Sequence, residues 1–215
     1  MPLYKIINHS IHTTIYVWRI EETSLDLFDS IVIADKSVVR LSGMKSDLHR
    51  RGFLSVRMLL QEAGYTDKDL SYDDLGKPHL SDGKHISITH SHHFSAIVVS
   101  DVQVGIDMEK IREKIAVIAP RFMEENFEFP DKKDPEYIKK LTALWGVKEC
   151  IFKIRNEAGI SFRNHIKVDP FDMLSQNGLA HLHFQGINQA FQMHFVQVQN
   201  FMLVYTFEKE IMLLN

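Results

Sequence analysis

Residues 145–153 read WGVKECIFK, and this stretch organises both the fold and the chemistry of the chain. It lies in a run of apolar periodicity that starts near Pro135, which predicts the inside of a long helix. Residues four apart share one helix face, so Trp145, Glu149 and Lys153 are expected to line up. A lone Glu–Lys pair at this spacing is most often a solvated surface pair. A chemical role for this face therefore requires a second polar cluster elsewhere in the chain.

The composition is typical of an ordinary globular protein, with 215 residues of which 45% are hydrophobic and 25% charged. A formal net charge of -3 argues against bulk binding to nucleic acid or to an anionic membrane. The single cysteine, Cys150, excludes an internal disulfide and suits a reducing compartment. The first residues lack a signal-peptide pattern, and no apolar run approaches the length of a membrane span. We therefore expect a cytoplasmic protein with a buried cysteine.

The first half of the chain predicts a strand, two helices and a pair of strands. The strand covers residues 11–20, the helices 25–39 and 46–64, and the paired strands 86–89 and 94–100. Turns are expected at 73–80, where Gly-Lys-Pro occurs, and at 81–83. Arg50 and Arg51 lie near the start of the second helix, where backbone N–H groups also favour a phosphate. In the run 90–93, one histidine is expected to donate to a ligand, which we favour over a zinc site because no cysteine is nearby.

The second half begins with an informative strand at 102–109. Its period-2 geometry places Asp107 and Glu109 on one face, and paired carboxylates are common where a hard cation is bound. An irregular segment is expected at 111–134, followed by a helix from Asp134 to about Arg155. Strands are expected at 166–168, 180–184, 191–198 and 202–207, with a turn at 176–178. The chain is thus interpreted as an α/β (α+β) protein in two halves, 1–103 and 104–215.

Together, Asp107, Glu109 and Glu149 supply three carboxylates, which can hold one Mg²⁺ that takes its remaining ligands from water and substrate phosphates. Lys148 and Lys153 are close enough in the sequence to bind phosphate oxygens and to offset charge on a leaving group. Arg50 or Arg51, Lys77 and His90 are further phosphate donors from the first half. The residues therefore favour phosphoryl-group chemistry on a ligand that carries a pyrophosphate.

The motifs 105–109 (GIDME) and 145–153 resemble the signature pair of the 4′-phosphopantetheinyl transferases. The stretches 76–78 (GKP) and 88–91 (ITHS) resemble two further motifs of the larger, monomeric type that activates surfactin synthetase. All of them occur in the expected order, so the resemblance covers residues from about 45 to 170. It implies a pseudo-dimer of two similar α/β halves, each with a mainly antiparallel sheet packed by a long helix, and an active site in the cleft between them.

The resemblance also implies an activity and a role for each matching residue. The enzyme would transfer 4′-phosphopantetheine from coenzyme A to a serine of an apo acyl or peptidyl carrier protein and release 3′,5′-ADP. Asp107, Glu109 and Glu149 would hold Mg²⁺, Glu149 would deprotonate the serine, and Lys153 would stabilise the leaving phosphate. The coenzyme A contacts implied in this way are Arg50, Arg51, Lys77, Pro78, Thr89, His90, Lys148 and Lys153.

The sequence departs from the family pattern at two places. Gly146 stands where the family more often has a small hydroxyl residue or cysteine, and we interpret this glycine as tolerated. The basic residues before the helix align in several ways, so the 3′-phosphate contact is left open among Lys36, Lys45, Arg50 and Arg51.

Partners and rival functions follow from the same residues. Carrier docking is assigned to 110–123, which mixes cations with apolar residues, and the alternative is a solvated connector. The rivals to the transferase are a Mg²⁺-dependent hydrolase of nucleotide or coenzyme A pyrophosphates and a non-catalytic module that only binds a carrier. We expect a monomer without nucleic-acid or membrane partners.

Overall fold

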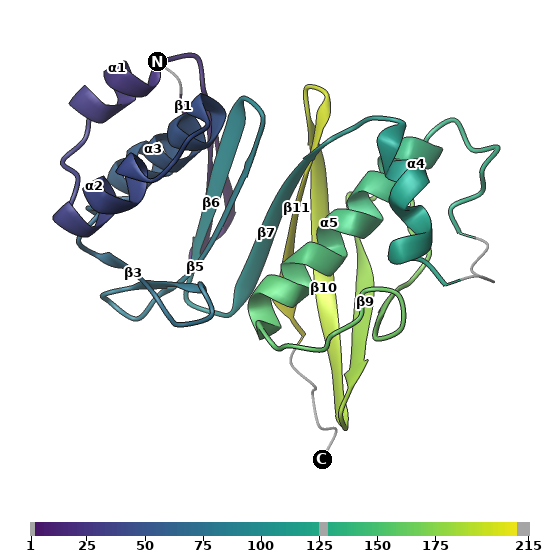
Figure 1. Ribbon diagram of the computed structural model, residues 1–215. Coiled ribbons are helices and arrows are strands. Elements are labelled where there is room, and N and C mark those ends of the chain that lie inside the picture. The colour runs from purple at the N-terminus through teal and green to yellow at the C-terminus, as the bar shows by residue number, and fades with distance from the viewer. Residues whose placement is uncertain (1–2, 125–128, 210–215) are drawn as a thin grey trace. The chain divides into compact units, whose positions relative to one another are not determined.

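The computed structural model describes residues 3–124 and 129–209 of the chain. The chain forms two compact units, Met1–Gln103 and Val104–Asn215. Each unit consists of an antiparallel sheet with a long helix on one face (Figure 1). The predicted class, α+β with antiparallel sheets, is confirmed.

The first unit is built on a four-stranded antiparallel sheet in the order β1-β2-β6-β5. Its strands are β1 (Leu3–Ser10), β2 (Thr13–Arg19), β5 (His85–Ser91) and β6 (Phe94–Ser100). The helix α3 (Asp47–Glu62) packs on β2, β5 and β6, and its apolar residues join those of the sheet in one core. The helix follows Ser46 and ends before Gly64, which has a φ of 85°. The predicted helix at 46–64 and the strands at 11–20, 86–89 and 94–100 are therefore confirmed.

The segment 25–39 does not form the single helix that its apolar residues predict. It is divided into α1 (Ser24–Asp29) and α2 (Asp35–Ser42). Thr23 starts α1 with a capping box, while the backbone N–H of Ala34 donates to the Asp67 carboxylate at 2.9 Å. Asp67 is itself fixed by a buried ion pair with Arg57 at 3.0 Å. The break between the helices is thus set by a contact from a distant residue, which helical periodicity does not encode.

Two elements of the first unit were missed in the sequence. One is β1, whose residues are half-buried or exposed because it lies at the edge of the sheet. The other is a small hairpin of β3 (Leu70–Tyr72) and β4 (Pro78–Leu80), which flanks the predicted turn. In that turn the Asp73 carboxylate accepts the backbone N–H groups of Leu75 and Lys77. Gly76 adopts a φ of 84°, a conformation that disfavours a side chain.

The second unit is built on a five-stranded antiparallel sheet in the order β7-β11-β10-β9-β8. Its strands are β7 (Val104–Lys110), β8 (Ile166–Val168), β9 (Asn177–Phe184), β10 (Ile187–Val198) and β11 (Phe201–Glu208). The helix α5 (Tyr137–Arg155) lies mainly on β7 and β11 and carries residues 145–153 (Figure 1). The predicted strands and the long helix are confirmed.

Two glycines allow α5 to approach the sheet closely. A Cβ atom on Gly105 of β7 would lie 2.2 Å from the carbonyl oxygen of Cys150 in α5. A Cβ atom on Gly146 of α5 would lie 2.7 Å from Cγ2 of Val204 in β11. Both contacts are shorter than packed atoms allow. At Gly146 the contact is with the buried side chain of Val204, which would have to shift, so this glycine fits the packing found here and is more than merely tolerated.

Several boundaries in the second unit differ from the sequence prediction. The helix begins at Tyr137 rather than at Asp134, whose carboxylate accepts the backbone N–H of Glu136 just before the helix starts. Residues 177 and 178 begin β9, and the turn lies just before them, ending at Gln176 with a φ of 54°. The irregular segment contains the short helices α4 (Lys114–Ile118) and η1 (Ala119–Arg121), and its residues 125–128 lie outside the described part. Within the described ranges, no helix has the length and apolar character needed to cross a membrane.

We predict that Gly105→Ala destabilises the protein by about 3 kcal/mol, because the added methyl group meets the backbone of α5, which has no free rotamer with which to yield. Gly43→Ala is the matched control. Gly43 ends α2 with a negative φ, and a Cβ atom there would meet only the carbonyl oxygen of Arg40, at 3.6 Å. We expect this control to change the free energy of unfolding by less than about 0.5 kcal/mol, measured by urea denaturation. Equal stabilities of the two variants would contradict the packing argument.

Candidate active site

The ammonium group of Lys153 on α5 contacts both the backbone and a side chain of β7. It donates to the carbonyl oxygen of Ile106 at 2.7 Å and to Oδ1 of Asp107 at 2.9 Å. The Asp107 side chain is 7% exposed and the Lys153 side chain 29%. Burial alone would lower the pKa of Lys153, but Asp107 and the other acidic groups nearby raise it, so the lysine stays charged. Lys153 is thus the counter-ion of a buried carboxylate.

Glu109 and Glu149 lie beside this pair and are half-buried. Burial and the negative charges of Asp107 and Glu149 raise the pKa of Glu109 to about 7. Burial and Asp107 likewise raise the pKa of Glu149. Lys153 opposes both shifts without cancelling them. The three carboxylates predicted from the sequence are therefore brought together closely enough for their charges to interact.

The donor set suits a hard divalent cation, because it consists of carboxylate oxygens that repel one another. Asp107, Glu109 and Glu149 are the residues that could hold such an ion. Across residues 3–124 and 129–209, no three His, Cys, Asp or Glu side chains already lie close enough together to hold a metal ion. The arrangement is a group of coupled carboxylates with Lys153 as its counter-ion, and it fits Mg²⁺ in chemistry and charge.

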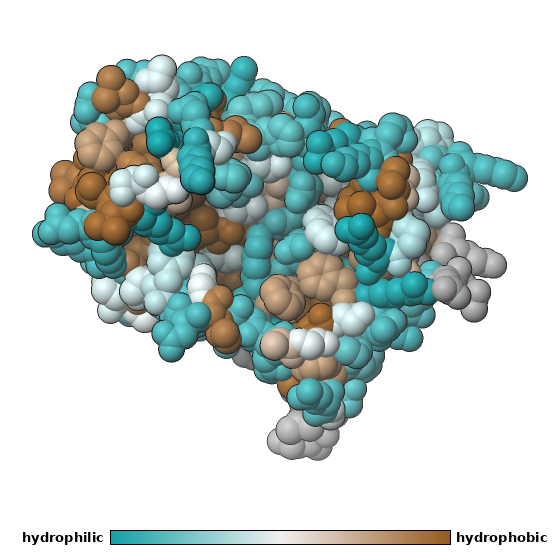
Figure 2. Space-filling view, viewed as in Figure 1, coloured by the Kyte–Doolittle hydropathy of each residue, from teal (hydrophilic) through white to brown (hydrophobic). Residues whose placement is uncertain are grey.

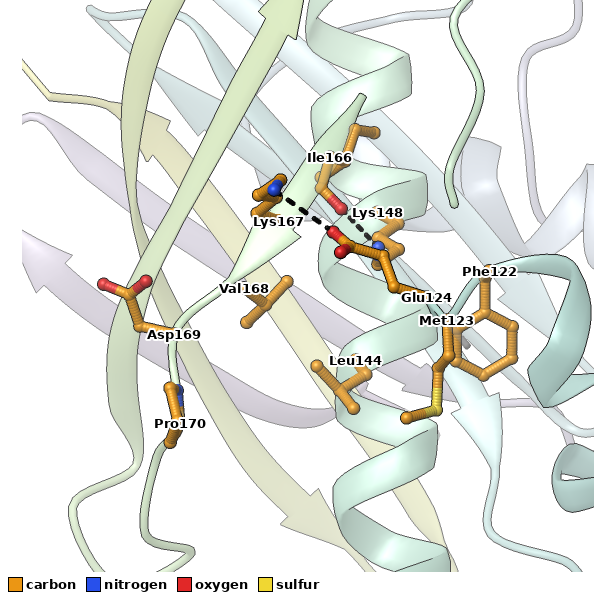
Figure 3. Close-up of a pocket in the computed structure, with 10 residues that line it drawn as sticks. All are labelled: Phe122, Met123, Glu124, Leu144, Lys148, Ile166, Lys167, Val168, Asp169 and Pro170. Atoms are coloured by element: carbon orange, nitrogen blue, oxygen red, sulfur yellow. Dashed lines mark hydrogen bonds and ion pairs between the residues drawn. The ribbon is translucent and has the colours of Figure 1, made fainter. Parts of the chain in front are cut away.

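Lys148 is not brought to the carboxylates. Its ammonium is buried and donates to the carbonyl oxygens of Phe162, at 2.6 Å, and Ile166. Figure 3 shows it on the wall of a cavity of about 190 Å³, next to an ion pair between Glu124 and Lys167 at 3.5 Å. Burial lowers the pKa of Lys148 to about 8. In this structure Lys148 ties α5 to the start of β8 and to the segment before it. The sequence predicted a phosphate ligand at this position and did not include this structural role.

In the first unit, His90 and the start of α3 lie together. His90 is exposed near the end of β5, and its ring lies 6.5 Å from that of His49 on α3. A Cβ atom on Gly52 would come within 3.2 Å of the His90 ring, so this glycine allows the histidine to lie against the helix. Thr89 is buried and points away from that surface, since neighbouring residues of a strand alternate in direction.

The cations that compete for a phosphate differ in their present contacts. Arg50 donates to the carbonyl oxygen of Met44 at 2.8 Å, and Arg51 to that of Ile20 at 3.0 Å. Lys36 donates to the carbonyl oxygen of Leu70 at 2.7 Å, and Lys45 is exposed. Both arginines keep further N–H groups for a ligand, because these bonds use one nitrogen of each guanidinium.

Lys77 and Pro78 lie on the β3–β4 hairpin, which contacts β5. Both are half-buried, and the backbone of Lys77 is fixed by Asp73 through the turn described above. The hairpin therefore places these two residues in the same unit as His90.

Trp145 of α5 and Glu109 of β7 line one cavity of about 140 Å³, so the tryptophan packs beside the strand that carries Asp107 and Glu109. The alignment of Trp145 with Glu149 and Lys153 was a usable signal, since all three contact or influence β7. Cys150 is fully buried, as predicted, and burial raises the pKa of its thiol, which makes it unsuited to act as a nucleophile.

We predict a pH-dependent gain of stability for Glu109→Gln in metal-free protein. The pKa of Glu109 rises from 4.5 to about 7 on folding, so the folded state binds more protons between these values and loses stability as the pH rises through them. Glutamine removes that loss. The free energy of unfolding of the variant minus that of the wild type should be larger at pH 8 than at pH 5. Urea denaturation in the presence of a chelator measures both values. A difference that does not change with pH would contradict the assigned shift.

Comparison with known proteins identifies two relatives of this chain. No protein-family model matches the chain. The "4'-phosphopantetheinyl transferase ffp" of Bacillus subtilis is 32% identical over 144 residues, which cover 62% of this chain and 63% of that protein. The "4'-phosphopantetheinyl transferase gsp" of Aneurinibacillus migulanus is 31% identical over 83 residues, 38% of this chain and 35% of that protein. The chain thus matches less than two thirds of the length of each relative. The predicted resemblance is confirmed: the chain is similar to 4′-phosphopantetheinyl transferases of the type that activates surfactin synthetase.

Proposed function

We propose that this protein transfers 4′-phosphopantetheine from coenzyme A to a serine hydroxyl of an apo acyl or peptidyl carrier protein. The observation that carries the proposal is the convergence of Asp107, Glu109, Glu149 and Lys153 on β7 and α5. These residues belong to the two motifs that resemble the transferase signature. The named activity of the two relatives supports the same reaction.

In the proposed reaction, Asp107, Glu109 and Glu149 hold Mg²⁺ on the coenzyme A pyrophosphate. The ion, when bound, neutralises the pyrophosphate and makes the β-phosphorus more electrophilic. Lys153 adds a positive charge that is already held in place by the carbonyl oxygen of Ile106. Because this lysine is fixed before substrate binds, stabilising charge on the leaving phosphate costs little reorganisation.

Glu149 is proposed as the group that takes the serine proton, directly or through water. Its raised pKa brings its basicity closer to neutrality than that of an exposed glutamate. The serine oxygen forms a bond to the β-phosphorus, and the bond from that phosphorus to the oxygen of the α-phosphate breaks. The products are the phosphopantetheinyl serine and 3′,5′-ADP, with the serine proton on Glu149 or solvent.

The coenzyme A contacts from the first unit are proposed from the resemblance and from the grouping at His90. His90 and an arginine of the pair Arg50 and Arg51 would hold the 3′-phosphate, and Lys77 and Pro78 would line the adenine side. On this proposal the two units act as the pseudo-dimer of the family, as a monomeric chain, with coenzyme A in the cleft between them. Lys148 is no longer favoured as a phosphate ligand, because two carbonyl oxygens already accept from its ammonium.

The deciding experiment incubates the protein with Mg²⁺, coenzyme A and an apo carrier protein and weighs the carrier by mass spectrometry. We expect a gain of one phosphopantetheine group and an equal amount of 3′,5′-ADP. Glu149→Gln should lower the rate at least about 100-fold while the circular-dichroism spectrum stays unchanged. Cleavage of coenzyme A without a carrier would favour the hydrolase. Carrier binding without any mass gain, over several carriers, would favour the non-catalytic module.

The carrier is proposed to dock on the segment 110–123. Figure 2 shows hydrophobic side chains over α4 among hydrophilic ones, and Val117 there is 78% exposed. Cations border the neighbouring cavity of about 140 Å³, namely Lys110, Arg112 and Lys114. This mixture suits an acidic partner with an apolar contact. Phe122 does not contribute as expected, because it is fully buried in the core of the second unit.

We predict that Val117→Glu raises the KM for the carrier about 10-fold and leaves kcat nearly unchanged, because it places a negative charge in the apolar part of the docking surface. Val39→Glu on α2 is the control, since Val39 is similarly exposed, at 72%, but belongs to the first unit. Steady-state kinetics with varied carrier concentration make the measurement. Equal KM values for the two variants would remove α4 from the docking surface.

A further inference from the structure

The ammonium group of Lys148 is a buried cation that the proposed reaction does not use. The residue is 5% exposed, and the carbonyl oxygens of Phe162 and Ile166 accept two of its three N–H donors. Carbonyl groups are dipoles without net charge. Among residues 3–124 and 129–209, no carboxylate forms an ion pair with Lys148. A buried charge without a counter-ion is costly, so a bound anion would stabilise this lysine.

Lys148 lies on the wall of the cavity of about 190 Å³, whose other walls are mainly apolar (Figure 3). Phe122, Leu144 and Val168 are buried in the core of the second unit, and Met123 is half-buried beside them. Apolar cavities of about 150 Å³ hold a benzene molecule, so this cavity has room for a six-membered ring. It therefore combines space for an apolar group with a buried cation.

The other charged groups on the cavity wall already have partners. Glu124 forms an ion pair with Lys167 at 3.5 Å, and its charge also favours the protonated form of Lys148. One carboxylate is thus shared between two lysines. In Figure 3 the Asp169 carboxylate is turned away from the other side chains, and it lies 3.2 Å from Nε2 of His181. The charge that remains at the cavity is positive and favours an anionic ligand.

We propose that this cavity binds a small monocarboxylate with an apolar, ring-sized body, its carboxylate on the ammonium of Lys148 and its body against Leu144 and Val168. A monocarboxylate fits better than a phosphate ester, because one spare N–H donor and apolar walls would leave most phosphate oxygens without donors. The inference does not rest on the proposed function, in which Lys148 has no part.

The first test uses the unmodified protein with benzoate as the probe, benzamide as its neutral counterpart and acetate as an anion without the ring. Binding is followed by NMR of the ¹³C-labelled methyl group of Met123, whose signal is assigned with Met123→Leu. We expect benzoate to shift this signal saturably with a Kd of about 1 mM, as for other ligands of this size. Benzamide and acetate should each bind at least about 10-fold more weakly, because each lacks one of the two contacts.

The second test is Lys148→Met, which keeps most of the length of the side chain and removes its charge. This variant should lose the preference for benzoate over benzamide. Lys139→Met is the control, because it removes another lysine of α5, one that pairs with Glu136, and it should leave both affinities unchanged.

Three outcomes would overturn the inference. Two concern the unmodified protein and do not require the variant at 148 to fold: equal affinities for benzoate and benzamide, or no shift of the Met123 signal. The third is a preference for benzoate that folded Lys148→Met protein retains.

Discussion

The close approach of α5 to β7 is the constraint on which the site depends. It is possible because Gly105 has no Cβ atom where the carbonyl of Cys150 passes. At this separation the ammonium of Lys153 can reach both the backbone of Ile106 and the carboxylate of Asp107. A larger residue at 105 would push the helix outward, and a half-buried charge pair would be exposed to water, where it is worth far less. Packing and electrostatics are therefore not separable here.

The same approach places Glu109 and Glu149 close to Asp107, so that their negative charges repel one another. One lysine does not neutralise three carboxylates. The folded protein therefore loses stability at pH values at which these groups are ionised. A divalent cation that binds the folded state would restore that stability. Sites that bind charged ligands commonly trade stability for affinity in this way.

Much of this arrangement could be predicted from the sequence because it depends on local periodicity. The alternation along β7 placed Asp107 and Glu109 on one face, and the four-residue spacing along α5 placed Glu149 on the face of Lys153. That these two faces meet was a hypothesis, which the resemblance to the transferases supported. Contacts between distant segments could not be predicted. The break at residue 34 depends on Asp67, and the orientation of Lys148 depends on carbonyl groups at 162 and 166. Neither contact leaves a periodic signal in the sequence, so the missed features are those that tertiary hydrogen bonds decide.

The different directions of Lys148 and Lys153 could have been predicted from helical geometry. Five residues along an α-helix correspond to about 140° around its axis, so the two lysines point in different directions. Lys153 shares a face with Glu149, and this face is directed to the carboxylates of β7. Lys148 is directed to the carbonyl oxygens of Phe162, before β8, and of Ile166, at the start of β8. The two lysines of one motif thus have different roles: Lys153 pairs with the carboxylate of Asp107, and Lys148 ties α5 to the chain around β8.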